Sequence, residues 1–278
     1  MTMVSIRKEL KEYGLVPRKR WGQHFLIDRN ILNKVIQSAQ LEKGDIVLEI
    51  GPGLGEMTLA LARHVRKVIA VEIDPKLVKI LGEKTRDFSN IMIVEGDILK
   101  IDFEQLDRPK NQRLKVVANL PYQISTPLLF RFIESRDFFS TLTLMLQREV
   151  AERMIASPGG KNYGPLSVFT QSFLKLSIPF YVKPSAFFPP PKVESAVIHM
   201  AWMERPLIGL EEEDWFKKVV RGCFSYRRKR LVNALRYADI ALPEDLERRV
   251  ERVGINPQRR PETLSIQEFV LLAETLKS

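Results

Sequence analysis

The chain has 278 residues, of which 45% are hydrophobic and 28% are charged, as in folded globular proteins rather than disordered ones. No apolar run approaches the roughly 20 residues that a membrane span requires. A single cysteine excludes a disulfide framework and a thiolate zinc site.

The charge distribution indicates a polyanionic partner. Lys and Arg number 44 against 34 Asp and Glu, so the net charge is +10. Residues 1–40 carry +5 and residues 205–278 carry +3, whereas the longer segment between them carries only +2. Two basic flanks around a nearly neutral middle favour nucleic acid as the partner. A merely basic soluble protein would show the same totals.

The N-terminal residues predict no targeting segment. The first 14 residues contain Glu9 and Glu12 and no apolar stretch, unlike a signal or transit peptide. The three histidines, His24, His64 and His199, lie far apart in sequence, and no pair has the spacing of metal ligands. We therefore expect a cytoplasmic protein that binds no metal and no membrane.

From residue 46 onwards, short β-branched segments alternate with helical patterns. The candidate strands are 46–51, 67–73, 91–97, 114–120 and 141–147. This alternation predicts an α/β, Rossmann-like fold with a mostly parallel sheet covered by helices on both faces. Two more strand-like segments, 173–182 and 196–203, are joined by a proline-rich loop, which predicts an antiparallel hairpin at the edge of a seven-stranded sheet.

The chain after Pro206 has only helical patterns, over 211–222, 226–238, 243–253 and 265–276. We therefore predict two domains. The first, residues 1–204, contains the sheet, and the second, residues 205–278, is a small all-helical domain.

A glycine-rich loop, Glu49-Ile50-Gly51-Pro52-Gly53-Leu54-Gly55, follows the first strand and precedes a helix. Glycines allow a ligand to approach the backbone closely. Glu72 ends the second strand, where a carboxylate suits ribose hydroxyls. Asp97 ends the third strand, where it can accept from the amine of an adenine. One such carboxylate alone would most simply be a solvated strand end, but three near successive strand ends favour a nucleoside site.

The loop favours S-adenosylmethionine (SAM) over a dinucleotide. A dinucleotide fingerprint requires glycine at position 56, which is Glu56 in this chain. The carboxylate of Glu49 would repel a pyrophosphate, whereas the ammonium and sulfonium groups of SAM are cationic. Gly51 and Gly53 would then face the cofactor.

The tetrapeptide Asn119-Leu120-Pro121-Tyr122 ends the fourth strand, at the sheet edge that faces a bound ligand. Together with the loop Glu49–Gly55, it resembles the motifs of methyltransferases that act on adenine N6. Residues 19–26 (KRWGQHFL) resemble the K-x-x-G-Q-x-F-L motif of the rRNA adenine dimethyltransferases, and residues 187–195 resemble their F-x-P-x-P-x-V-x-S motif. The resemblance extends from about residue 17 to residue 275.

The most similar type is the bacterial small-subunit (16S) rRNA adenine dimethyltransferase. The resemblance implies a class I SAM-dependent methyltransferase fold with a helical C-terminal domain. It implies dimethylation of two adjacent adenines in the 3′-terminal hairpin, within an immature small subunit, by a monomer. It also implies that the cofactor is framed by Gln23, His24, Leu26, Gly51, Glu72, Asp97 and Asn119. Two positions differ from the usual motif of this family: His24 stands where many members have asparagine, and Trp21 stands where phenylalanine is frequent.

Methylation at N6 requires an activated amine, because the nitrogen lone pair is delocalised into the adenine ring. The side-chain oxygen of Asn119 and the carbonyl of Leu120 can accept from the amine hydrogens. Pro121 stiffens the turn, and Tyr122 can stack on the base. We expect Phe187 to cover the other face of the base, with core packing as the alternative role of Phe187 and Phe188.

A basic stretch in the second domain, predicted to lie on a helix, is expected to contact RNA phosphates together with Lys19 and Arg20. Its members are Arg221, Arg227, Arg228, Lys229 and Arg230. The alternative is a solvated helix face. Two other functions fit the same motifs: a large-subunit (23S) rRNA adenine methyltransferase of the antibiotic-resistance type, and a non-catalytic RNA-binding relative.

Overall fold

The computed structural model describes residues 3–18, 21–240 and 245–277. The chain divides into two compact units. The first comprises residues 1–151 and 177–201, and the second comprises residues 152–176 and 202–278.

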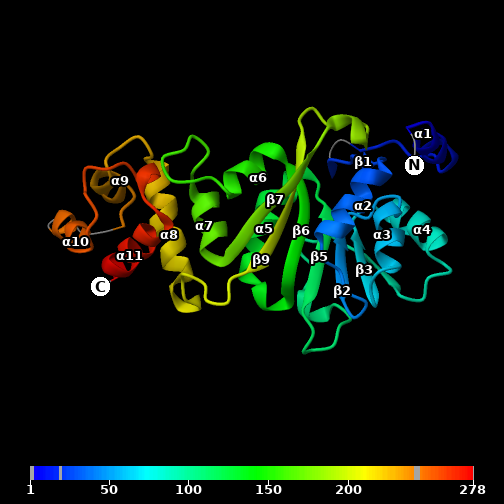
Figure 1. Ribbon diagram of the computed structural model, residues 1–278, viewed down its shortest axis with the longest axis horizontal. Helices are drawn as coiled ribbons and strands as arrows, with labels where there is room; N and C mark the ends of the chain where they lie inside the picture. The colour runs from blue at the N-terminus through cyan, green and yellow to red at the C-terminus, as the bar shows by residue number, and fades with distance from the viewer. Residues whose placement is uncertain (1–2, 19–20, 241–244, 278) are drawn as a thin grey trace. The chain divides into compact units, whose positions relative to one another are not determined.

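A seven-stranded sheet in the order β4-β3-β2-β5-β6-β9-β7 forms the framework of the first unit (Figure 1). Strands β2 to β6 pair in parallel, and β9 is antiparallel to β6, so the predicted mostly parallel sheet is confirmed. The strands are β2 (Ile46–Ile50), β3 (Lys67–Glu72), β4 (Ile91–Glu95), β5 (Leu114–Asn119), β6 (Phe139–Gln147), β7 (Leu174–Val182) and β9 (Ser195–Trp202).

The central strands are buried on both faces, as their continuous apolar runs predict. All five residues of β2 are buried. The helices that follow these strands or precede them in this unit include α2 (Arg29–Ser38), α3 (Glu56–Ala62), α4 (Pro75–Lys84) and α5 (Ser125–Glu134). Asp28 and Asp74 begin α2 and α4, because each carboxylate accepts hydrogen bonds from the first backbone amides of its helix.

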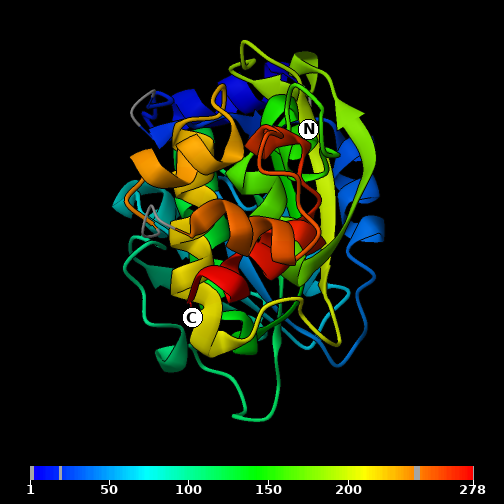
Figure 2. The ribbon, with the colours of Figure 1, turned by 90° about the vertical axis from the view of Figure 1, so that its left-hand side faces the viewer.

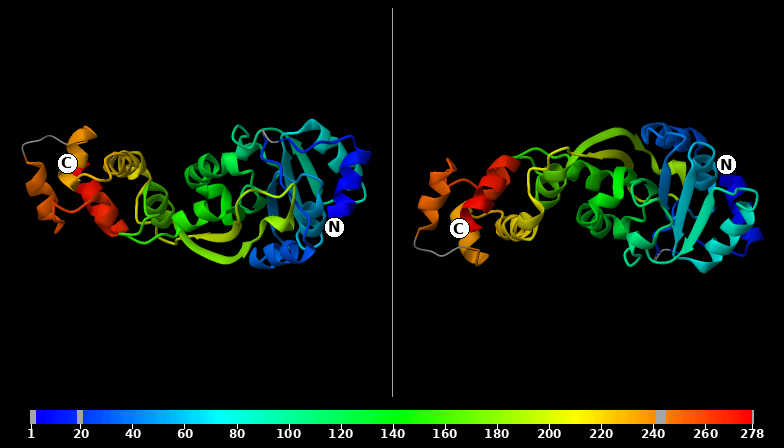
Figure 3. Two further views of the ribbon diagram at one scale, coloured as in Figure 1. Left: turned by 90° about the horizontal axis from the view of Figure 1, so that it is seen from above. Right: turned by 90° about the horizontal axis from the view of Figure 1, so that it is seen from below.

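A second, two-stranded sheet joins the N-terminal motif to the proline-rich loop. In this sheet β1 (Phe25–Leu26) pairs antiparallel with β8 (Phe187–Phe188), and Ile27 donates to the carbonyl of Ala186 at 2.8 Å. Helix α1 (Met3–Glu12) belongs to the same unit and lies at its edge in both views of Figure 3, and its Ile6 and Leu10 are buried in an apolar cluster with Leu54. These pairings bring together two motifs about 160 residues apart.

The second unit is helical. Its helices are α7 (Pro165–Phe173), α8 (Glu213–Ser225), α9 (Leu231–Tyr237), α10 (Leu246–Arg252) and α11 (Ile266–Lys277), and α11 lies against α8 in Figure 2. Edge-to-face rings fill its core: Tyr163 packs on Phe224 at 6.0 Å and Phe169 on Phe216 at 5.7 Å. Residues 152–176, which the sequence assigned to the first domain, lie in this unit because their aromatic side chains pack there. Short helix α6 (Arg148–Met154) spans the change of unit.

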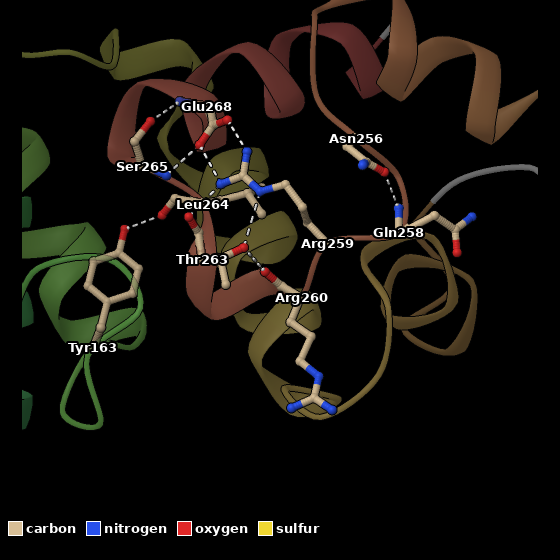
Figure 4. A network of polar contacts seen from close by, with 9 residues as sticks. All are labelled: Tyr163, Asn256, Gln258, Arg259, Arg260, Thr263, Leu264, Ser265 and Glu268. Atoms are coloured by element: carbon tan, nitrogen blue, oxygen red, sulfur yellow. Dashed lines mark hydrogen bonds and ion pairs between the residues drawn. The ribbon is translucent and has the colours of Figure 1, made fainter.

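A network of polar contacts lies at the N-terminal end of helix α11 (Figure 4). The amide of Glu268 donates to the Ser265 hydroxyl at 3.1 Å, and the Glu268 carboxylate accepts from the Ser265 amide at 2.7 Å. Arg259 donates to the same carboxylate, and the Tyr163 hydroxyl donates to the carbonyl of Leu264 at 2.9 Å. Burial alone would raise the pKa of Glu268, but the hydrogen bonds from Arg259 and Ser265 outweigh it and lower the pKa. The network therefore stabilises the start of α11 with an ionised carboxylate.

Candidate active site

The glycine loop after β2 adopts a backbone that other residues rarely adopt. Gly51, Gly53 and Gly55 all have positive φ, at 66°, 58° and 84°. A β-carbon on Gly53 would lie 3.0 Å from the ring of Phe25, so the space beside this residue is already filled. The positive φ angles let the loop turn sharply, and without β-carbons Gly51 and Gly53 bring their backbone into the wall of the cavity.

Glu72 lies at the end of β3 and holds this loop in place. Its Oε2 accepts from the Gly53 amide at 3.2 Å, and its Oε1 accepts from the Ile73 and Asp74 amides at 2.9 and 3.0 Å. Burial raises the pKa of Glu72, and these three amides act in the opposite direction. Oε1 already accepts from two amides, whereas Oε2 accepts from one and retains a lone pair, so Glu72 can also accept from a ligand hydroxyl.

Glu49 is a buried carboxyl in the wall of the same cavity. Its Oε2 has no hydrogen-bond partner among the residues that the structure describes. Burial raises the pKa of Glu49 to about 8, the neighbouring Thr58 hydroxyl lowers it, and the charge of Glu72 raises it further. A buried oxygen without a partner matches the cationic end of SAM, which would favour the ionised form.

The shifted pKa of Glu49 predicts a stability that falls as pH rises. Between pH 4.5 and about 8 the unfolded chain releases a proton that the native carboxyl retains. Rising pH therefore favours unfolding over that window, by on the order of a few kcal/mol. We expect denaturant unfolding from pH 5 to 9 to show this decline, and Glu49→Gln to flatten it. An unchanged slope in the variant would contradict a protonated Glu49.

Asn119 ends β5, and its amide has a defined orientation. Its Nδ2 donates to the backbone carbonyl of His24 at 2.9 Å, which identifies the other end of the amide as the acceptor oxygen. The next residue, Leu120, donates its amide to the carbonyl of Met145 at 3.1 Å. Asn119, Leu120 and Pro121 all line the cavity. The strand end thus presents two acceptors, a side-chain oxygen and a backbone carbonyl.

Tyr122 follows in a short 3-10 turn and is held by Ser195 of the proline-rich motif. The two hydroxyls share a hydrogen bond at 2.7 Å. The Tyr122 ring lies 5.8 Å from the His24 ring, with 29° between their planes. Burial raises the pKa of Tyr122, so the phenol is neutral near pH 7. Sequence reasoning did not assign Ser195 to the site, although it occupies the serine position of the recognised motif.

The N-terminal motif closes the cavity from another side. His24 Nδ1 lies 2.6 Å from the carbonyl oxygen of Pro189, and Gln23 Oε1 accepts from the amide of Arg18 at 2.8 Å. Leu26 pairs with Phe187 in the two-stranded sheet. His24 therefore contacts Asn119 through its backbone and the proline-rich loop through its ring.

One cavity of about 210 Å³ brings most of the predicted site together. Its walls include Gln23, His24, Leu26, Glu49, Gly51, Gly53, Glu72, Asp97, Asn119, Leu120, Pro121 and Tyr122. Sequence reasoning missed further wall residues, among them Ile6, Phe25, Met57 and Ile98. Ile6 and Met57 have no chemical signature in the sequence, because only folding brings apolar side chains to this wall.

Phe187 does not line this cavity. Its side chain is fully buried in the core of the first unit, beside residues such as Ala186 and Val197. A ring in this position stacks on a base only after it has left the core. Core packing, which the sequence analysis kept as the alternative, is the role observed in this structure.

The predicted RNA-contacting residues differ in their surroundings. Arg228, Lys229 and Arg230 are exposed and lie in the connection between α8 and α9, not on a helix as predicted, since α8 ends at Ser225 and α9 begins at Leu231. Arg227 instead donates to Glu262 at 3.2 Å and to the carbonyls of Lys161 and Gly160. Arg221 is exposed on α8. Lys19 and Arg20 lie outside the described residues.

Within the described ranges, no helix is long and apolar enough to cross a membrane. The same part of the chain contains no group of three or more His, Cys, Asp or Glu that could hold a metal ion.

The strand order, the glycine loop and the acidic strand ends define a class I SAM-dependent methyltransferase, and similar proteins narrow the class. Residues 15–278 match the family described as "Ribosomal RNA adenine dimethylase". The chain belongs to this family of enzymes, and SAM is the cofactor, as the motifs predicted.

Individual relatives agree with this assignment. The chain is 44% identical to "Ribosomal RNA small subunit methyltransferase A" of Geobacter metallireducens, over 95% of this chain and 96% of the relative. The crystal structure of a dimethyladenosine transferase from Plasmodium falciparum has a TM-score of 0.78 at 30% identity and covers 90% of this chain and 96% of that one. The 23S rRNA methyltransferase ErmE has a TM-score of 0.71 at 25% identity and covers 91% of this chain and all of that one.

Proposed function

We propose that this protein transfers methyl groups from SAM to N6 of two adjacent adenines in the 3′-terminal hairpin of 16S rRNA. The observation that carries the proposal is the oriented amide of Asn119. It stands at the end of β5, donates its Nδ2 hydrogen to His24, and lines the same cavity as the glycine loop. An acceptor next to the cofactor site is what methylation of an exocyclic amine requires.

The residues of the cavity fit the cofactor. Glu72 would accept from the ribose hydroxyls, and Asp97 from the adenine amine. The unpartnered oxygen of Glu49 would face the cationic amino-acid end. Gln23, His24 and Leu26 would frame the cofactor from the N-terminal side, and the backbone of Gly51 and Gly53 would lie against it.

Bound SAM supplies an already activated methyl group, so the protein contributes mainly position. The Asn119 oxygen and the Leu120 carbonyl accept from the N6 hydrogens, which favours the tetrahedral, more nucleophilic amine. Tyr122, held by Ser195, stacks on the base. Such stacking is worth roughly 1–3 kcal/mol per base, which offsets part of the cost of extruding the base. An aromatic wall also tolerates the cation that develops on N6.

The substrate assignment rests on the relatives. Three relatives named for the small subunit are 41–44% identical to this chain, whereas the 23S enzyme ErmE is 25% identical. We further propose that the substrate is an immature small subunit, and that the protein acts as a cytoplasmic monomer. Three exposed cations, Arg228, Lys229 and Arg230, would hold RNA phosphates.

Mapping of the modified base tests the proposed function. Purified protein is incubated with methyl-labelled SAM and either small-subunit particles lacking the modification, free small-subunit RNA, or large-subunit RNA. We expect dimethyladenine at two adjacent adenines of small-subunit RNA, with the highest yield on the particles. Modification of large-subunit RNA alone would replace this proposal with the antibiotic-resistance type, and SAM binding without turnover on any RNA would indicate a non-catalytic relative.

Replacing Arg228, Lys229 and Arg230 together with alanine should weaken RNA binding and reduce its salt dependence. Removing one cation from a phosphate should lower the log–log salt slope by about 0.7–0.9. Affinity for SAM should not change. Arg227→Ala is a separate comparison, since its contacts with Glu262 and with residues 160–161 predict a loss of thermal stability. A full salt slope in the triple variant would show that this turn is only a solvated surface.

A further inference from the structure

Two tyrosines lie side by side on the surface of the helical unit. Tyr226 directly follows α8 and Tyr237 ends α9, and their ring centroids are 5.2 Å apart with 39° between the planes. The two residues are 39% and 58% exposed. We call this pair the tyrosine platform. Two adjacent rings that are open to solvent offer a flat apolar surface, of the kind on which a nucleic-acid base can stack.

The platform is bordered by cations. Lys229 Nζ lies 6.0 Å from the ring centroid of Tyr237, and Arg228 and Arg230 are exposed in the same turn. Arg236 forms an ion pair with Glu247 at 3.6 Å, so the negative charge of Glu247 is balanced. Among the described residues close in sequence, Asp239 is a further exposed carboxylate. In this part of the chain, exposed cations therefore outnumber exposed carboxylates beside the two rings.

The turn that carries the platform is anchored from within its own unit. Arg227 binds Glu262 and the carbonyls of residues 160 and 161. The Lys229 amide donates to the Tyr226 carbonyl at 2.8 Å, and the Leu231 amide donates to the Arg259 carbonyl at 2.7 Å. Ordering this surface on binding therefore costs little conformational entropy.

We propose that the tyrosine platform stacks on an unpaired base of the RNA substrate, while Arg228, Lys229 and Arg230 hold the flanking phosphates. The inference rests on the proposed function, which makes RNA the substrate. Exposed rings bordered by cations have the chemistry of single-stranded nucleic-acid sites, where rings stack on bases and cations follow the backbone. Duplex RNA offers no open base face, so the platform distinguishes unpaired from paired RNA.

The test compares binding of two RNA probes, a short single-stranded oligoribonucleotide of mixed sequence and a duplex of the same length. We expect Tyr226→Ala/Tyr237→Ala to weaken single-strand binding by about ten- to a hundredfold. Duplex binding should stay within about twofold of wild type, and the salt slope should not change, because every cation that binds phosphate remains in place. Tyr226→Phe/Tyr237→Phe should bind like wild type, since the rings remain.

Tyr181→Ala is the matched control. Tyr181 is 46% exposed and lies 4.7 Å beneath the guanidinium of Arg148, but it belongs to the first unit. It should bind both probes like wild type. Unchanged single-strand binding by the double alanine variant would overturn the proposal, as would equal losses on both probes. A phenylalanine variant as weak as the alanine one would also overturn it, because hydroxyl contacts would then explain binding. Failure of the proposed function would be seen in a different measurement: the wild-type protein would then methylate no small-subunit RNA, whatever the binding of the two probes.

Discussion

Asn119→Ala is expected to lower the single-turnover rate of methylation by about a hundred- to a thousandfold, the usual effect of removing one preorganised electrostatic partner. The amide oxygen is needed most when N6 becomes tetrahedral, so the loss falls on the rate constant more than on substrate affinity. RNA binding should persist. The second methylation should suffer at least as much, since N6-methyladenine keeps only one hydrogen for the acceptors. Rapid-quench assays at saturating SAM and RNA measure both steps.

The hydrogen bond from Asn119 Nδ2 to the His24 carbonyl, at 2.9 Å, suggests a sharper comparison. Asn119→Asp keeps an acceptor oxygen but loses the donor, and two oxygens then face each other. We expect its rate to fall between those of wild type and Asn119→Ala, with circular dichroism and thermal melting confirming a native fold for each variant. A rate near wild type for Asn119→Ala would remove Asn119 from the catalytic acceptors.

Glu72→Gln is expected to weaken SAM binding by about ten- to a hundredfold, measured by titration calorimetry. A hydrogen bond to a charged group contributes about 1.5–3 kcal/mol, and the variant removes the charge that would accept from the ribose. Glutamine is preferred to alanine, because its one amide oxygen can still accept from the Ile73 and Asp74 amides, although its NH2 group cannot accept from Gly53. Alanine would leave these three amides without their partner and would lower stability as well.

The chain offers a matched control for Glu72. Glu95 is its register partner on β4 and is exposed, and it does not line the cavity. Glu95→Gln removes the same charge one strand away and should bind SAM like wild type. Equal losses in both variants would mean that general electrostatics, rather than a specific contact, explains the effect. Unchanged affinity in Glu72→Gln would refute the ribose assignment.

Much of the fold and most of the cofactor site could be predicted from local sequence. The five parallel strands were predicted to within two residues at each end, since apolar β-branched runs bounded by glycines and helical patterns have few alternatives. Glu49, Glu72, Asp97 and Asn119 could be placed together because the ends of parallel strands meet at one edge of a sheet. Helix boundaries after residue 205 were less accurate, and the basic turn at 226–230 was predicted as helix.

Other features depend on contacts between distant segments. No local pattern predicts that β1 pairs with β8, that Ser195 holds Tyr122, or that the His24 carbonyl orients Asn119. Arg227 and Arg228 are neighbours of identical type, yet only the positions of Glu262 and the 160–161 carbonyls decide that Arg227 is held within its unit. The roles of Phe187 and Phe188 likewise could not be predicted from the sequence. Only the folded chain shows that the Phe187 ring lies in the core of the first unit, and that Phe188 packs against a second apolar cluster.

The sequence by itself determined the strands, the glycine loop, the acidic strand ends and the tetrapeptide Asn119–Tyr122, because backbone propensity and side-chain chemistry act over a few residues. Only the tertiary structure decided which hydrogen bond orients each side chain and which ring remains exposed. The direction of a side chain depends on partners up to about 160 residues away, as with His24 and Pro189. A local sequence pattern does not show which distant segments come into contact, because folding alone brings them together.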